Sequence, residues 1–228
     1  MMQEKIYTIP VNEAFEQHEN CPFCEIYNKL EKNEIELITG ASMMEPDIRI
    51  KTNELGFCRA HFAKMFAVPQ RLPLALTLQT HLDQLRKETK AGALLGDPAA
   101  KVIKRLEKLE QDCYVCRRIE RHFPRMLETA CSLFESEREF REKFISQKYF
   151  CLPHYKLLLE TAKRVCSKKG YPELVKAADA IVTAYMDSLY DDISLFCKKF
   201  DYNYRDVPWG TAKDSVERSI KFITSDNG

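Results

Sequence analysis

The feature that most constrains this chain is a set of cysteines and histidines that occurs twice at nearly the same spacing. Each copy consists of a Cys-x-x-Cys pair followed by a Cys-x-x-His pair. The second copy lies 92 residues after the first at the Cys-x-x-Cys pair (113 − 21) and 93 residues after it at the Cys-x-x-His pair (151 − 58). The candidate metal ligands are Cys21, Cys24, Cys58 and His61 in the first copy and Cys113, Cys116, Cys151 and His154 in the second.

This residue set predicts two metal sites, each with three thiolates and one imidazole. Two residues between ligands let both side chains of a pair reach one ion, and Cys3His sets are typical of closed tetrahedral zinc sites. We therefore expect two Zn²⁺ ions per chain, one bound by the four ligands of each copy. An iron–sulfur cluster on the same ligands is the main alternative, because thiolates also suit such clusters.

A disulfide framework explains the pattern less well than a metal. The chain has nine cysteines, an odd number, and the two histidines keep the same register as the cysteines. No apolar run typical of a secretory signal precedes Cys21, and no later stretch is long and apolar enough to span a bilayer. We expect a cytoplasmic protein, because a reducing compartment favours metal-bound thiolates.

The charge of the chain points to no class of partner. Its 35 basic and 34 acidic residues give a net charge of +1 and are mixed along the sequence. This balance gives no electrostatic argument for binding nucleic acid or an anionic membrane. The partner is then an unknown protein or a small ligand, and the sequence leaves homo-oligomerisation open.

The spacing of apolar residues predicts an all-α protein. Apolar residues recur at three- and four-residue steps, and only seven glycines are present. A short helix is expected to start with Asp47 as its N-cap, and another near Arg59, with Cys58 at its edge. Residues 1–20 are expected to be extended, and the aromatic loop 201–210 to cap the helical core. The longer predicted helices cover 22–39, 72–90, 99–111, 117–135, 172–200 and 212–223.

The repeat extends beyond the ligands and suggests two pseudo-repeated helical units. Asp47–Lys51 aligns with Glu139–Lys143 at an offset of 92, so that Arg49 aligns with Arg141. We expect an N-terminal zinc-binding unit over 1–95 and a C-terminal one over 96–228, the latter with a long helix and a C-terminal cap. Arg49 and Arg141 are predicted either to donate to the ligand sulfurs or to form salt bridges within their own helices.

These residues carry a resemblance to a known family. The combination of Cys21-Pro22-Phe23-Cys24, Gly56-Phe57-Cys58-x-x-His61, Cys113-x-x-Cys116 and Phe150-Cys151-Leu152-Pro153-His154 resembles a bacterial family catalogued as domain of unknown function 6062. The resemblance runs over nearly the whole chain. One departure is Tyr114, since proline usually follows the first cysteine of both pairs in that family. The resemblance implies a cytosolic, helical, cysteine-rich protein and supplies no reaction.

Three classes of function are compatible with the sequence. The first is a non-catalytic binding or scaffold protein with two structural zinc sites, since four protein ligands leave no open position on the metal. The second is a thiol-redox or metal-responsive regulator that releases zinc on oxidation. The third is an iron–sulfur or other metalloenzyme, although no phosphate-binding loop or nucleophile motif is present. The sequence favours the first class and favours a protein that is not an enzyme.

Overall fold

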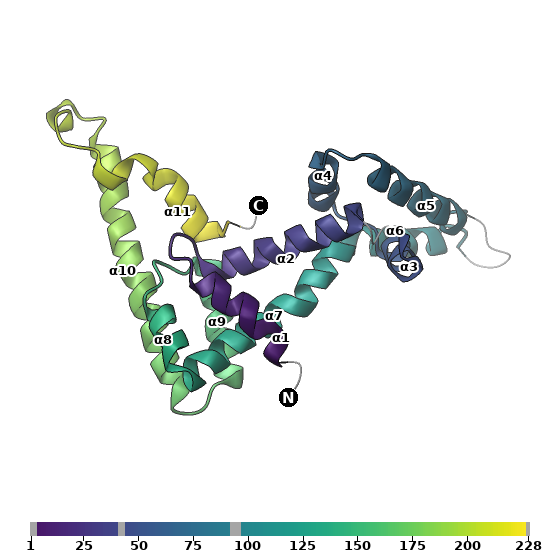
Figure 1. Ribbon diagram of the computed structural model, residues 1–228. Helices are drawn as coiled ribbons and strands as arrows, with labels where there is room; N and C mark the ends of the chain where they lie inside the picture. The colour runs from purple at the N-terminus through teal and green to yellow at the C-terminus, as the bar shows by residue number, and fades with distance from the viewer. Residues whose placement is uncertain (1–3, 41–43, 92–96, 227–228) are drawn as a thin grey trace. The chain divides into compact units, whose positions relative to one another are not determined.

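The computed structural model describes residues 4–40, 44–91 and 97–226, and within these ranges the chain is helical with no strand. The predicted all-α fold is therefore confirmed (Figure 1). The α-helices are α1 (Glu4–Phe15), α2 (Pro22–Thr39), α3 (Pro46–Leu55), α4 (Arg59–Ala67), α5 (Leu72–Glu88), α6 (Ala100–Gln111), α7 (Tyr114–Ser136), α8 (Arg138–Ile145), α9 (Leu152–Val165), α10 (Gly170–Lys198) and α11 (Ser215–Thr224).

The N-terminal segment is a helix, so the prediction of an extended lead-in was wrong. Pro10 lies inside α1 and cannot donate the hydrogen bond expected of an interior residue. Tyr7, Val11 and Phe15 nevertheless recur at four-residue steps and are all buried. Packing of this face stabilises α1 despite the proline, because most helical stability in proteins comes from tertiary contacts.

The chain divides into two compact units, but they are not the two sequence halves. Unit 1 contains residues 1–28 and 123–228, and unit 2 contains residues 29–122. The predicted boundary between residues 95 and 96 lies outside the described residues. The unit boundaries instead fall within α2 and within α7, each of which carries the chain from one unit to the other. Unit 2 is thus inserted into unit 1.

Unit 1 is built on a cluster of phenylalanine rings. Phe15 lies with its ring centroid 4.8–6.3 Å from those of Phe23, Phe140, Phe144 and Phe150, and all five side chains are fully buried. Buried aromatic pairs contribute about 0.5–1.5 kcal/mol each beyond the area they bury. The cluster joins α1, the start of α2, α8 and the residue before Cys151, and it therefore holds two of the metal-binding segments together.

The long C-terminal helix completes unit 1 together with the short helix that follows it. α10 buries one stripe of residues that includes Leu174, Ile181 and Tyr185. α11 packs on α9 and α10 (Figure 1). The ring of Phe222 contacts those of Tyr149 and Tyr185. α11 therefore covers the core of unit 1.

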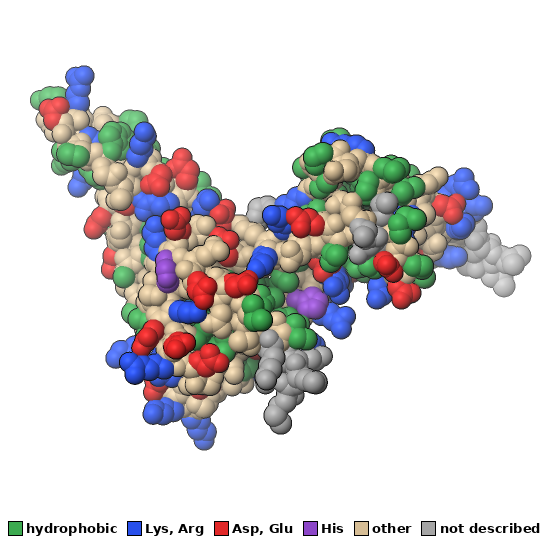
Figure 2. All heavy atoms as spheres, in the orientation of Figure 1, with side chains coloured by type: hydrophobic (Ala, Val, Ile, Leu, Met, Phe, Trp, Pro, Cys, Tyr) green, Lys and Arg blue, Asp and Glu red, His purple; other side chains and the backbone are tan. Residues whose placement is uncertain are grey.

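The aromatic loop between α10 and α11 does not cap the core. Phe200 and Tyr202 are 81% and 85% exposed. Trp209 packs at the end of α10, with its ring centroid 5.6 Å from that of Phe196 and 5.3 Å from Lys199 Nζ. Hydrophobic side chains accordingly gather on the surface at this end of α10 (Figure 2).

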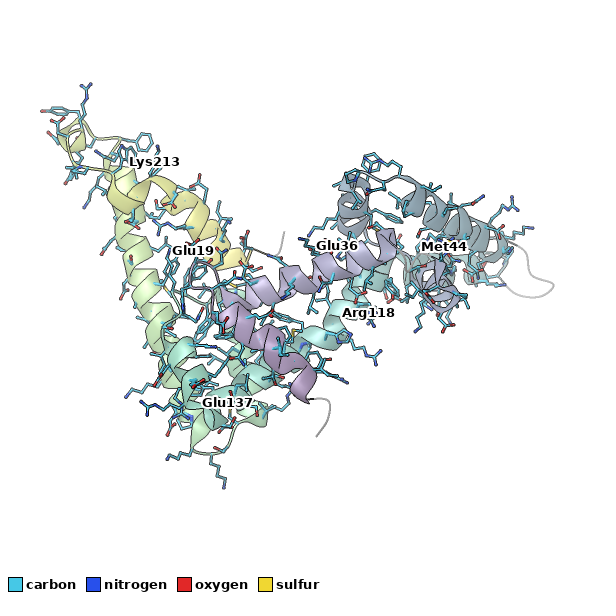
Figure 3. All side chains as sticks on the ribbon, viewed as in Figure 1. Glu19, Glu36, Met44, Arg118, Glu137 and Lys213 are labelled. Atoms are coloured by element: carbon cyan, nitrogen blue, oxygen red, sulfur yellow. The ribbon has the colours of Figure 1, made fainter. Side chains whose placement is uncertain are left out.

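Unit 2 combines α3, α4, α5 and α6 with the second half of α2 and the start of α7. α3 packs on α5, and Gly56 ends α3 with φ 66°, a left-handed conformation that favours glycine. The Gly56 carbonyl accepts a hydrogen bond from Tyr114 N at 2.9 Å. Arg118 on α7, labelled in Figure 3, donates to Glu34 on α2 at 2.9 Å. These contacts bring the start of α7 beside the residues that precede α4.

The surface shows no large region of one charge in the view of Figure 2, where acidic and basic side chains are interspersed. In the described part of the chain, each helix is too short or too polar to cross a membrane.

Candidate metal centres

The structure brings the eight predicted ligands together in two groups of four. Site 1, in unit 1, consists of Cys21, Cys24, Cys151 and His154. Site 2, in unit 2, consists of Cys58, His61, Cys113 and Cys116. Each site joins a Cys-x-x-Cys pair from one repeat to the Cys-x-x-His pair of the other. The prediction that each repeat fills its own site was therefore wrong.

The path of α2 explains the exchange of partners. The helix starts at site 1 and runs for 18 residues, which corresponds to about 27 Å at 1.5 Å per residue. Its second half belongs to unit 2, where Glu31 contacts His61 and Glu34 contacts Arg118. The Cys-x-x-His pair that follows α2 therefore meets the next Cys-x-x-Cys pair, at the start of α7.

All four ligand pairs occupy the same place on a helix. The first ligand of each pair directly precedes the helix and the second lies in its first turn, at the starts of α2, α4, α7 and α9. The carbonyls of Cys21, Cys58, Cys113 and Cys151 each accept a hydrogen bond from the backbone N–H four residues later. Two helix N-termini thus point at each site, and their dipoles stabilise negatively charged sulfur. The predicted position of Cys58 at the edge of a helix is confirmed.

The ligand atoms of each site lie close enough together to bind a single tetrahedral ion. With Zn–S about 2.3 Å and Zn–N about 2.0–2.1 Å, tetrahedral geometry places two sulfurs about 3.8 Å apart and a sulfur and a nitrogen about 3.6 Å apart. In site 1, Cys24 Sγ lies 3.7 Å from Cys151 Sγ, and His154 Nδ1 lies 3.2–3.8 Å from the three sulfurs. In site 2, His61 Nδ1 lies 3.1–3.5 Å from the three sulfurs. Each residue set fits one ion with Nδ1 as the nitrogen ligand.

Protonation of the ligands follows from their burial. Burial is the main cause that raises the pKa of the Cys21 thiol, and likewise that of the Cys116 thiol, to about 12. Burial also lowers the pKa of His154 to about 4 and lowers that of His61. The imidazoles are therefore neutral at pH 7, as metal ligands must be, whereas the thiols give up protons when a metal binds.

The surroundings of the two sites differ. In site 2, His61 Nε2 donates to Glu31 Oε1 at 3.0 Å, and Lys64 Nζ donates to the other carboxylate oxygen. A carboxylate on the second ring nitrogen fixes the imidazole with Nδ1 free for the metal. In site 1, the rings of Phe23 and Phe123 lie 6.2 Å and 5.2 Å from that of His154.

The C-terminal segment contributes a hydrogen bond to site 1. Asp226 N donates to Cys24 Sγ at 3.4 Å, and Asn28 Nδ2 donates to Asp226 O at 2.9 Å. Sequence reasoning singled out neither Glu31 nor Asp226. Glu31 lies seven residues after Cys24, about two helical turns, which is the one signal that could have indicated it.

The repeated arginines do not reach the ligand sulfurs, so that hypothesis was wrong. Arg49 donates to Leu76 O, Thr77 Oγ1 and Thr80 Oγ1 on α5. Arg141 donates to the carbonyls of Phe134 and Glu135 and lies 3.9 Å from Glu173. Both arginines join helices within their own unit.

The other three cysteines lie outside the two sites. Burial as small apolar side chains, the simplest expectation for all three, holds for Cys131, whereas Cys166 is half-buried and Cys197 is exposed. All nine cysteines are free of disulfides.

Comparison with known proteins identifies a family but no function. No curated protein and no solved structure is significantly similar to this chain. One family model matches residues 2–227, nearly the whole length, and it is described as a family of unknown function. The eight ligands of sites 1 and 2 all fall within the match. The chain therefore belongs to the family of unknown function DUF6062.

Proposed function

We propose that this protein is a non-catalytic zinc-binding scaffold in which one structural Zn²⁺ ion holds each unit together. The observation that carries the proposal is the geometry of the two sites. In each, the four ligand atoms lie within 4.8 Å of one another, although they come from two segments far apart in the chain. Spacings of this size suit one ion better than a polynuclear cluster, which spreads its cysteine ligands over several iron atoms.

The ligand set also supports a structural role. Three cysteines and one histidine fill all four positions of tetrahedral zinc and leave none for water or substrate, which catalytic zinc needs. Structural zinc contributes about 10–16 kcal/mol in zinc-finger peptides. That is as large as the whole stability of an ordinary domain, about 5–15 kcal/mol. A unit that loses its ion is therefore expected to lose its fold.

Unit 2 has particular need of such a contribution, because few large side chains are buried in it. Its buried hydrophobic residues in the described ranges are Ile35, Ile38, Phe57, Met65, Leu74, Cys113, Tyr114, Val115 and Ile119. Five of them lie at or within three residues of a site 2 ligand. The proposed zinc would thus act as the centre of this core.

The proposal includes a reducing location and a partner. Nine disulfide-free cysteines support a role in the cytoplasm, where thiols stay reduced. A scaffold of this kind serves a partner, which we propose is a protein or a small ligand that binds outside the two closed sites.

Elemental analysis and refolding test the proposal. We expect two zinc ions per chain in protein purified without added metal. Protein stripped of metal in denaturant with a chelator should regain its helical circular dichroism on dilution with zinc and a thiol reductant, and should remain unfolded without zinc. Fewer than two metal ions, or full refolding without metal, would contradict the structural role. Detection of iron together with inorganic sulfide would show that the sites bind an iron–sulfur cluster instead of zinc.

A further inference from the structure

The two sites differ in how far their ligands are shielded from water. In site 1, Cys21 and Cys151 are 0% exposed, and Cys24 and His154 are 2% exposed. In site 2, His61 and Cys113 are buried, but Cys58 and Cys116 are only half-buried. A molecule that competes for the metal must approach it past a ligand. Such an approach is open at Cys58 and Cys116 and closed on every ligand of site 1.

The groups around the ligands reinforce this difference. Site 1 lies against the buried rings of Phe23 and Phe123, and Cys24 receives the backbone N–H of Asp226. Site 2 lies against an ion pair, in which the Glu31 side chain is 12% exposed and the Lys64 side chain 31% exposed. Apolar packing excludes a polar competitor, whereas a charged and partly hydrated surround admits one.

Glu31 opposes complete loss of the ion from site 2. Its carboxylate accepts the Nε2–H of His61 and holds the ring with Nδ1 towards the three sulfurs. Ligand loss at this site then starts at a half-buried sulfur rather than at the imidazole, which stays in place.

From these observations we propose that small soft-donor ligands can remove zinc from site 2 or deliver it there. The zinc of site 1, in contrast, does not exchange while unit 1 is folded. This inference rests on the proposed function, since it needs a metal in both sites. In the exchange step, a thiolate or an aromatic nitrogen of the competitor binds the ion as the sulfur of Cys58 or Cys116 leaves. The departing thiolate takes up a proton, zinc stays divalent and no electron is transferred. Site 2 therefore lets the protein give up or accept one zinc ion without unfolding unit 1.

Chelator competition tests the inference on the full-length, zinc-loaded protein. Excess 4-(2-pyridylazo)resorcinol at pH 7 should take up one zinc ion per chain in a first phase and the other only in a separate, slower phase or after denaturation. Iodoacetamide labelling after the first phase, followed by peptide mass spectrometry, assigns the released ion. Label should appear on Cys58, Cys113 and Cys116, and Cys21, Cys24 and Cys151 should remain unlabelled.

Substitution of Glu31 provides a second measurement that needs no cysteine variant. Glu31→Gln should speed the first phase about 10–100-fold, the usual cost of losing such an outer hydrogen-bond partner, and leave the second phase unchanged. Glu36→Gln is the matched control on the same helix, because the Glu36 side chain is 62% exposed and forms an ion pair with exposed Lys32. Release of both ions in one phase, or first labelling of site 1 cysteines, would overturn the inference while the proposed function stands. A total of fewer than two zinc ions after denaturation would overturn the proposed function itself.

Discussion

Glu31 and Phe123 occupy the same position in the two repeats, 92 residues apart (123 − 31), and each contacts the histidine of its own repeat. Glu31 Oε1 lies 3.0 Å from His61 Nε2, and the Phe123 ring centroid lies 5.2 Å from that of His154. One repeat position thus supplies a carboxylate to site 2 and an aromatic ring to site 1. The symmetry of the ligands is kept while the surroundings of the two histidines differ.

Truncation of Phe123 is expected to destabilise unit 1. The side chain is 6% exposed and contacts the rings of Tyr27 and His154. Phe123→Ala should lower the free energy of unfolding of the zinc-loaded protein by about 3–5 kcal/mol, because it leaves a cavity beside the metal site. Urea unfolding followed by circular dichroism measures the change. Tyr202→Ala, at an 85% exposed residue, should change it by no more than about 0.5 kcal/mol.

Gly56 and Gly210 form a matched pair for testing the geometry of site 2. Both have positive φ, 66° and 50°. A Cβ on Gly56 would lie 2.7 Å from Leu109 Cδ1, while one on Gly210 would meet nothing within 4 Å. Gly210→Ala should cost only the backbone strain, about 1 kcal/mol. Gly56→Ala adds the clash and shifts the carbonyl that binds Tyr114 N, and so should also weaken zinc binding in site 2.

Thermal unfolding and competition with a chelator measure the two effects of these glycine variants separately. Equal losses of stability in Gly56→Ala and Gly210→Ala would show that the space around Gly56 does not matter.

Loss of Arg49 should weaken the packing of α3 on α5 rather than metal binding. Its guanidinium satisfies Leu76 O, Thr77 Oγ1 and Thr80 Oγ1. Arg49→Met should destabilise unit 2 by about 1–3 kcal/mol, because part-buried acceptors lose their donor. The zinc affinity of the folded protein should stay close to that of the wild type. Lys51→Met, an exposed position on the same helix, serves as control, and a large drop in zinc affinity in Arg49→Met alone would restore a role at the sulfurs.

The ion pair between Asp192 and Arg218 predicts a pH dependence in unit 1. Burial by itself would raise the pKa of Asp192, but hydrogen bonds from Arg218 and Thr211, both at 2.7 Å, outweigh it and lower the pKa. A carboxyl with a lowered folded-state pKa adds stability above its unfolded pKa of about 3.9. That stability is lost as the pH falls through the folded value.

Asp192→Asn should therefore unfold more easily than the wild type at pH 7, and the difference should shrink as the pH drops below about 4. Fluorescence of Trp209, the only tryptophan, reports on the end of α10 near this pair. Because any acid-driven metal release affects both proteins alike, the difference between them isolates Asp192. A difference that stays constant from pH 7 to pH 3 would contradict the assignment.

Local patterns predicted the helices well and the long-range pairing badly. α2, at 22–39, has the predicted bounds, because apolar spacing and helix ends are local signals. α1 was not predicted because a proline such as Pro10 usually interrupts a helix. The buried contacts of Val11 and Phe15 stabilise the helix despite this proline. The residues of the candidate sites were identifiable from their spacing, but their grouping was not.

The grouping depends on a property that ligand spacing does not contain. Cys58 follows Cys24 by 34 residues and Cys151 follows Cys116 by 35. Pairing the ligands within each repeat therefore gives the same Cys3His sets as the observed pairing across the repeats. The observed arrangement accompanies the division of α2 between the units, since the second half of that helix belongs to unit 2. Glu31 was hidden for the same reason, because its contact with His61 exists only once α2 and α4 pack.

The order of the ligands along the chain determines which site has all its ligands first during synthesis on the ribosome. Site 2 has all its ligands once Cys116 has emerged, whereas Cys21 and Cys24 wait for His154, which is 38 residues later (154 − 116). At about 5–20 residues per second this is roughly 2–8 s. A metal ion bound by the inserted unit during that time would engage Cys58 and His61, which could then no longer compete for an ion with Cys21 and Cys24. The ligand set of the inserted unit is thus complete before that of the unit that surrounds it in the sequence.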